Sequence, residues 1–407
     1  MARPVHAPLD AAGVGAILTA DAPVASIGVL AVALAFHVAG SALLAFGAPP
    51  LAALHAFAGF IVLAVVATSH QLLPVLLRVP PTPWAQTVIP AAGFACGFAL
   101  LVFSFMGGGE FAAAGTLLAL SSALWCTFTG SRVLRAAGER ATAAAMGAAF
   151  LAFLVAAFFG VWMAYDLAGG AAPSQAVADV HGTLMVAVFA SMLIVALSYR
   201  FVPMFALAHA NAYGKRWMQW MFLAGGAVMA ANFASIGAGL SLVSLGALAY
   251  QHGRTLQARL RKRLDASLIY AMAAWAFAIA SAGLVCVRGL TPASVVPALA
   301  LAVLGWLSIT IFGYGLKICG FLSWQVAKQR APESALAPLA SAIPLPAAYA
   351  SLATLSLGTL LIAFGGAGAS IAGQAGCAVY LAGALAYIAT FASVAYPYLL
   401  CRSERHA

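Results

Sequence analysis

The sequence is poor in charge. Only 7 % of its 407 residues are Asp, Glu, Lys or Arg, whereas about a quarter of the residues of a soluble globular domain are charged. Apolar runs of about 20 residues recur along the chain, and such a run is long enough to cross a bilayer as an α-helix. The lack of charge excludes a soluble domain. The sequence therefore predicts an all-α integral membrane protein that contacts membrane lipids.

Paired cysteines are also missing. The six cysteines are scattered singly and form no Cys-x-x-Cys pair, so neither a zinc site nor a disulfide framework is indicated. No stretch combines a basic start, a short apolar core and a small-residue cleavage site, so we expect the N-terminus to be retained. A net charge of +10 would suit nucleic acid in a soluble protein. In a membrane protein it reports topology, and no nucleic-acid partner is expected.

The apolar runs predict twelve transmembrane helices in a single membrane domain, residues 1–407. The seventh and eighth are short and share a tight turn near Asn232–Ile236. The expected spans are roughly 24–46, 51–77, 86–106, 111–131, 141–165, 177–207, 217–233, 235–252, 266–288, 295–326, 347–365 and 372–400.

The basic residues predict the orientation. With these twelve spans, all but one of the 19 lysines and arginines fall on one side of the membrane, and the exception is Arg288. The positive-inside rule places that side in the cytoplasm. We therefore expect both termini in the cytoplasm of a bacterial-type inner membrane.

One stretch occurs in three versions. It runs from His181 to Phe205, with an earlier version from His55 to Leu76 and a weaker one around Leu316–Leu322. Alignment of their ends puts Gln71, Arg200 and Lys317 in register, at spacings of 129 and 117 residues, with Pro74, Pro203 and Gly320 three residues later. Such self-similarity indicates internal repeats, here of four spans each, at about 24–135, 141–265 and 266–401. An even number of spans keeps each repeat in one orientation, related by an axis along the membrane normal.

His55 and His181 are the leading site candidates. Each lies about four residues, roughly 6 Å, into a helix that starts at the outer face, on equivalent helices of two repeats. An ionisable residue within a membrane span is a functional candidate by default. Neutral imidazole binds haem iron and copper alike. We interpret the pair as a shared haem or metal site, with unrelated structural histidines as the alternative.

Further candidates lie along the same helices. His70 is fifteen residues, about 22 Å, past His55, so it cannot bind the same metal. It aligns with Tyr199, which favours a structural or proton-handling role. His37, near the middle of the first span, is a candidate for a second site. Met185, one turn after His181, is either a copper ligand or core filler.

The remaining polar candidates sit near the ends of spans. Arg200 and Lys317 are expected to be snorkelling anchors, with pairing to haem propionates or lipid phosphates as the alternative. Four further histidines are expected to be solvated: His6, His209, His252 and His406.

Three phrases carry a family resemblance: HQLLPVLL, HGTLMVAVFASMLIVALSYRFVPMF and GWLSITIFGYGLKICGFLSW. With twelve spans and outer histidines on spans two and six, the chain resembles subunit I of the haem–copper oxidases, near the small NnrS-type haem–copper membrane proteins. The resemblance implies three four-helix arcs, haem b or copper as cofactor, and a redox partner or other membrane subunits. It also implies a role in respiration, copper handling or nitric-oxide stress. His55 matches the low-spin haem ligand of span two, and His181 matches the first copper ligand of span six.

The chain departs from that family at the catalytic centre. Residues 295–326, where the family carries its haem ligands, contain no histidine, and neither does 217–233, where a copper-binding pair would lie. Met185 stands where a tyrosine would follow the first copper ligand. We therefore expect no catalytic residues and no reduction of oxygen or nitric oxide by this chain alone. A twelve-helix transporter and an assembly factor that binds nothing are the alternative functions.

Overall fold

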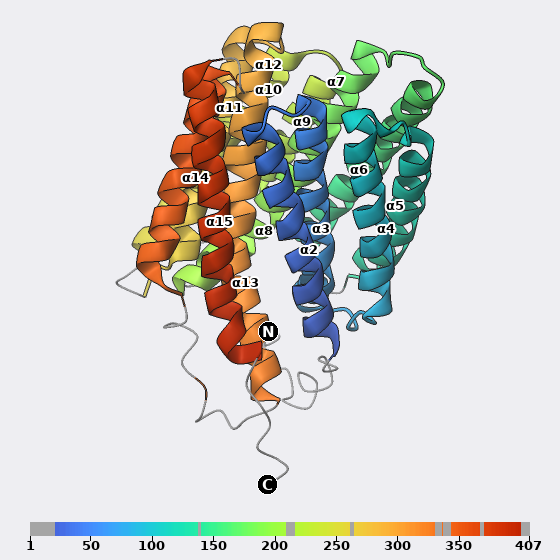
Figure 1. Ribbon diagram of the computed structural model, residues 1–407. Coiled ribbons are helices and arrows are strands. Elements are labelled where there is room, and N and C mark those ends of the chain that lie inside the picture. Colours follow the sequence, from blue (N-terminus) through green and yellow to red (C-terminus); the bar gives the residue numbers. More distant parts are fainter. Residues whose placement is uncertain are drawn as a thin grey trace, which may run out of the picture.

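The computed structural model describes residues 21–136, 140–208, 216–260, 264–329, 336, 343–366 and 370–399. These residues form helices and short connections, with no β-strand among them (Figure 1). Twelve helical rods cross the bundle, three of which contain a π-helical segment. They are α2 (Asp21–Ala45), α3 (Pro50–Leu77), α4 with η1 (Ala85–Phe103, Ser104–Gly108), α5 (Phe111–Leu134), α6 (Arg140–Ala168), α7–η2–α8 (Gln175–Thr183, Leu184–Ala190, Ser191–Ala206), α9 (Trp217–Ala230), α10 (Ala234–Gln257), α11 (Ala266–Arg288), α12–η4–α13 (Pro292–Leu299, Ala300–Ser308, Ile309–Lys328), α14 (Leu345–Gly365) and α15 (Ile371–Leu399).

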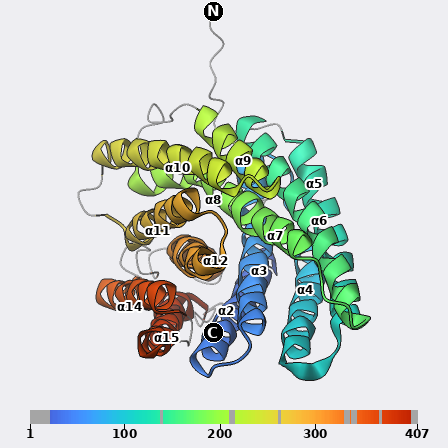
Figure 2. The ribbon, with the colours of Figure 1, turned by 90° about the horizontal axis from the view of Figure 1, so that it is seen from above.

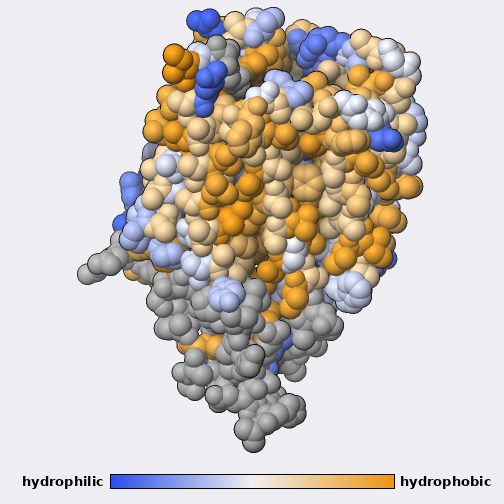
Figure 3. All heavy atoms as spheres, viewed as in Figure 1, coloured by the Kyte–Doolittle hydropathy of each residue, from blue (hydrophilic) through white to orange (hydrophobic). Residues whose placement is uncertain are grey.

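Eleven of these rods are long and apolar enough to cross a membrane, and the molecular surface carries apolar residues along the bundle (Figure 3). The chain is therefore an all-α, multi-pass membrane protein. The twelfth rod, α9, has only 14 residues, about 21 Å against a hydrocarbon core of about 30 Å. The predicted tight turn after it is confirmed: α9 and α10 are joined by three residues, with Asn232 at φ +67°.

The rods pack in three sets of four: α2–α5, α6–α10 and α11–α15. The last helix of each set packs on the first helix of the next, so α5 contacts α6, α10 contacts α11 and α15 contacts α2. The sets thereby close into a ring around the centre of the bundle (Figure 2).

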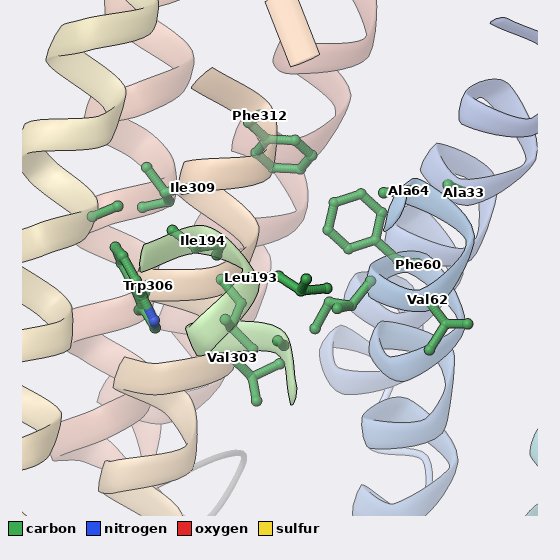
Figure 4. Close-up of a cluster of buried hydrophobic side chains, with 14 of the residues drawn as sticks. Ala33, Phe60, Val62, Ala64, Leu193, Ile194, Val303, Trp306, Ile309 and Phe312 are labelled. Atoms are coloured by element: carbon green, nitrogen blue, oxygen red, sulfur yellow. The ribbon is translucent and has the colours of Figure 1, made fainter. Parts of the chain in front are cut away.

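The second rod of each set is the most buried. In α3 and α12–η4–α13, 67 % of the most apolar window is buried, and in α7–η2–α8 56 %, against 33–44 % in the other spans. Side chains from these three central rods meet in the core (Figure 4). They are the same helices that the sequence repeat aligned.

Two central rods share a π-helical segment in the same register. Segments η2 and η4 end before Ser191 and Ile309, and the hydroxyls of Ser191 and Ser308 donate to the carbonyls of Val186 and Val303, five residues earlier, at 2.7 and 2.8 Å. Ser191 and Ser308 are separated by the repeat spacing of 117 residues. A π segment leaves carbonyls without their usual α-helical donor, and each serine satisfies one of them. The corresponding residue of α3 is Val62, where the helix stays α.

Each junction between sets is filled by aromatic rings. Trp125 packs against Phe94, Phe150, Phe153 and Phe189 between the first and second sets. Trp306 and Trp275 pack with His252 and Tyr199 between the second and third sets. Phe60 packs with His37 and Phe312 between the third and first sets, where Phe57 and Tyr380 pack with each other and with His37.

Each junction contains an aromatic residue at the same register position of a central rod. These residues, Phe60, Phe189 and Trp306, are separated by the same 129 and 117 residues that relate Gln71, Arg200 and Lys317. The aromatic packing therefore follows the register of the sequence alignment. Because the rings fill the space between sets, they hold the three sets together by apolar contact.

Candidate functional site

The central rods α3 and α7–η2–α8 begin at the upper end of the bundle in Figure 1, and His55 and His181 lie near their starts. Pro50 begins α3, where proline is favoured because the first helical N–H needs no partner, and His55 follows on the next turn. Ser174 precedes α7, which carries His181 before the π segment. Both side chains are half-buried. The two imidazoles interact electrostatically, which places both candidate residues in one region of the bundle.

The His55 ring is fixed by its own helix and by an aromatic neighbour. Its Nδ1 donates to the Leu51 carbonyl at 2.7 Å. Phe105, on η1, stacks on it with ring centroids 4.8 Å apart and planes 24° apart. Phe105 is in turn held edge-on by Phe111 at the start of α5. The first set therefore fixes both the tilt and one face of this imidazole.

The His181 ring is fixed by a helix of its own set, α6. Its Nδ1 donates to the Ala156 carbonyl at 2.8 Å. The residue one turn further along α6 is Gly160, and a Cβ there would stand 2.8 Å from Cε1 and 3.2 Å from Nδ1 of the imidazole. Glycine leaves the space that the ring fills. The close approach of His181 to α6 therefore depends on the missing side chain.

These two hydrogen bonds define the chemistry of the pair. A carbonyl oxygen can only accept, so in each ring Nδ1 must carry the proton. In a neutral imidazole the lone pair then lies on Nε2, which makes no hydrogen bond to the described residues in either histidine. Metal-binding histidines are held in this way, with the other N–H donated to a carbonyl or carboxylate. The pair presents two nitrogen ligands of fixed tautomer.

The number of protein ligands limits the metal. The described residues hold no group of three or more His, Cys, Asp and Glu side chains that could surround an ion. A zinc site needs three or four protein ligands. Two imidazoles suffice where another group supplies the rest of the coordination sphere, as the porphyrin of a haem does.

Two of the other candidates lie elsewhere. Met185 packs against the hydrophobic core, which fits the core-filler alternative. His37 is 1 % exposed and lies in the junction of the third and first sets, with Phe60 and Phe312 edge-on at 4.6 Å. Neither of its ring nitrogens has a hydrogen-bond partner among the described residues.

The lower end of the bundle holds another group of candidates. His70 is buried, and neither ring nitrogen has a hydrogen-bond partner in the described parts of the chain. It lies within electrostatic range of Arg132, which donates to the Pro80 carbonyl. Tyr199 is buried beneath the Arg216 guanidinium, 4.4 Å from its ring centre, and Arg200 beside it is half-buried. None of these residues reaches the upper pair.

Two expectations about polar residues change. His252 was expected to be solvated, and that prediction is wrong: it is 6 % exposed and packs between Tyr199 and Trp275. Lys317 is more than an anchor, because it forms a salt bridge with Asp265, whose other carboxylate oxygen caps the start of α11 through the Ser267 N–H. The three other histidines expected to be solvated, His6, His209 and His406, lie outside the described residues.

Two residues of the site were missed from the sequence. Phe105 follows His55 by fifty residues and Gly160 precedes His181 by twenty-one, and no motif links either to its histidine. Gly160 is one of 39 glycines, and nothing in the sequence distinguishes it from the others. Its role becomes visible only when α6 and α7 are packed together.

The chain was compared with models of known protein families and with curated proteins, and neither comparison finds a match.

Proposed function

We propose that this chain binds a haem group, of b type, between His55 and His181 near one face of the membrane. The observation that carries the proposal is the matched setting of the two imidazoles. Each gives its Nδ1 proton to a backbone carbonyl, and each keeps an Nε2 lone pair for a metal. Both stand within electrostatic range of one another. Haem supplies one-electron redox chemistry, and the residues of this chain hold and orient the ligands.

The number of protein ligands favours haem over a bare ion, because two imidazoles complete the coordination of an iron that a porphyrin already holds. Phe105 stacks on the His55 ring and fixes its plane. Copper remains the second metal, because imidazole suits it too, and the test below separates the two.

The wider role follows from the resemblance to haem–copper oxidase subunit I. Three cyclic sets of four helices support it, and so does a ligand histidine on the second rod of the first two sets. The third central rod has no histidine between Pro292 and Lys328. We infer an oxidase-like membrane protein with an incomplete catalytic centre, active in respiration, copper handling or nitric-oxide stress together with a redox partner or another membrane subunit.

Haem binding predicts an absorption spectrum. Protein expressed with sufficient haem and purified in detergent should show the narrow α and β bands of a six-coordinate, low-spin b haem after reduction with dithionite, at about one haem per chain. Metal analysis of the same sample distinguishes copper. If the sample is colourless but contains copper, the two-histidine site is supported and haem binding is rejected. A sample with neither overturns the proposal and favours the transporter.

We further propose that the upper end of the bundle faces outward, with both termini in the cytoplasm of a bacterial-type inner membrane. The support is the side on which the basic residues gather. Reporters fused after Gly109 and after Arg135 should then read opposite sides, with Arg135 cytoplasmic. If both reporters read the same side, α5 does not cross the membrane and the proposed orientation fails.

A further inference from the structure

A partly open cavity of about 70 Å³ lies at the centre of the bundle, where the three central rods meet. Its lining follows the sequence repeat. Ala64 on α3 has Leu193 and Thr310 as its counterparts at the 129- and 117-residue spacings, and all three line the cavity. The same holds for other residues of α3: each of them lines the cavity together with both of its counterparts on the other central rods. The α3 residues of these triplets are Ile61, Ala64, Val65, Thr68 and Leu72. The cavity therefore lies on the axis that relates the three sets.

The positions on each rod form one helical face. The α3 residues of the triplets stand at i, i+3, i+4, i+7 and i+11 from Ile61, which is the spacing of one face of an α-helix. The same stripe on each of the three central rods faces the axis. The three central rods lie inside the ring of outer helices (Figure 2), and the side chains that line the cavity are buried or half-buried.

The polar groups of the lining are already satisfied. The hydroxyls of Thr68, Ser69 and Thr310 donate to carbonyls of their own helices, at 2.7 to 2.9 Å. The Tyr314 hydroxyl bonds to Ser198 at 2.7 Å. The rest of the lining is apolar. A buried water needs two to four polar partners, and apolar cavities stay dry and accept nonpolar guests.

Two alanines account for the space. Ala64 and Ala190 both line the cavity, while their counterparts are larger: Leu193 and Thr310 for the first, Ile61 and Leu307 for the second. Leucine already stands at the equivalent position of another set, as Leu193 for Ala64 and as Leu307 for Ala190. The cavity is therefore present because Ala64 and Ala190 are small, at positions where the equivalent residues of the other sets are larger.

We propose that this axial cavity is a binding site for a small nonpolar molecule, of the size of a diatomic gas or a noble-gas atom. The ligand is held by dispersion contacts with apolar side chains of all three sets and by exclusion from water. This site does not depend on haem binding at His55 and His181, so it can be tested independently of the proposed function.

Xenon is the probe. Crystals of the full-length protein pressurised with xenon should show one xenon atom between α3, η2–α8 and α13. Ala64→Leu and Ala190→Leu should each abolish that atom. The matched control is Ala92→Leu, the same change at an exposed position of α4, which should leave xenon in place. Each filled variant should keep or raise the thermal unfolding temperature of the parent protein, since it replaces empty space with side chain.

Two outcomes would overturn the proposal. One is parent protein without xenon at the axis. The other is xenon retained there in both filled variants. If a leucine variant unfolds, Ala190→Val adds less volume and should reduce the xenon occupancy in part, and full occupancy in that folded variant also rejects the site.

Discussion

Replacing either His55 or His181 with alanine is expected to remove the six-coordinate, low-spin haem spectrum. Each imidazole supplies one of the two axial nitrogens, so the loss of one leaves iron with a single protein ligand and an open position. The remaining haem should be five-coordinate and high-spin. The affinity should fall by more than the roughly 10–100-fold that a supporting outer-shell contact is worth. The measurement is the reduced-minus-oxidised spectrum, with haem content per chain, for each variant.

Two controls make this result specific. His70→Ala removes a buried histidine from the same helix as His55, about 22 Å away, and should leave the spectrum unchanged. His55→Gly should regain a low-spin spectrum when free imidazole is added, because the added ring can occupy the vacated ligand position. If only one of the two alanine variants alters the spectrum, the two histidines are not a ligand pair. If His70→Ala alters it as strongly, the site lies elsewhere.

Acid should release the haem from the parent protein, because each Nε2 must be unprotonated to bind metal.

The helices were accessible from the sequence, and so was the position of the candidate residues His55 and His181 along them. Runs of apolar residues fix helix positions because the bilayer demands complete backbone hydrogen bonding within each span. The depth of His55 and His181 follows from counting residues at 1.5 Å each. This depth depends only on the residue count along one helix, so it can be estimated without knowing how the helices pack. The sequence predicted short seventh and eighth spans; α9 is short, with 14 residues, whereas α10 has 24.

Contacts between helices were not accessible in the same way. His252 looks like a residue near a solvated helix end, and its burial depends on Tyr199 and Trp275 from two other helices. Lys317 looks like an anchor until α11 places Asp265 beside it. The register of Phe60, Phe189 and Trp306 was present in the sequence. It could have been found by extending the alignment from the helix ends to their middles.

Gly160→Ala tests whether the setting of His181, and not merely its presence, makes the site. The added methyl group would stand 2.8 Å from Cε1 of the imidazole, closer than carbon atoms approach in proteins. The ring must move away from α6 and lose its hydrogen bond to Ala156. We expect haem affinity to fall by about 10–100-fold, with a shifted midpoint potential and a weakened low-spin spectrum.

The fold should survive this change, which allows the loss of haem to be attributed to the ring. Alanine is favoured over glycine in a helix by about 1 kcal/mol, which offsets part of the local strain. Gly182→Ala is the matched control: it makes the same change beside His181, where a Cβ meets nothing within 4 Å, and it should leave potential and spectrum unchanged. Gly147→Ala repeats the control on α6, where the nearest atom is 3.5 Å away. A Gly160→Ala protein with parental potential, spectrum and affinity would show that His181 does not need α6. If the parent protein itself binds no haem or copper, the proposed function fails and Gly160 is only a packing residue.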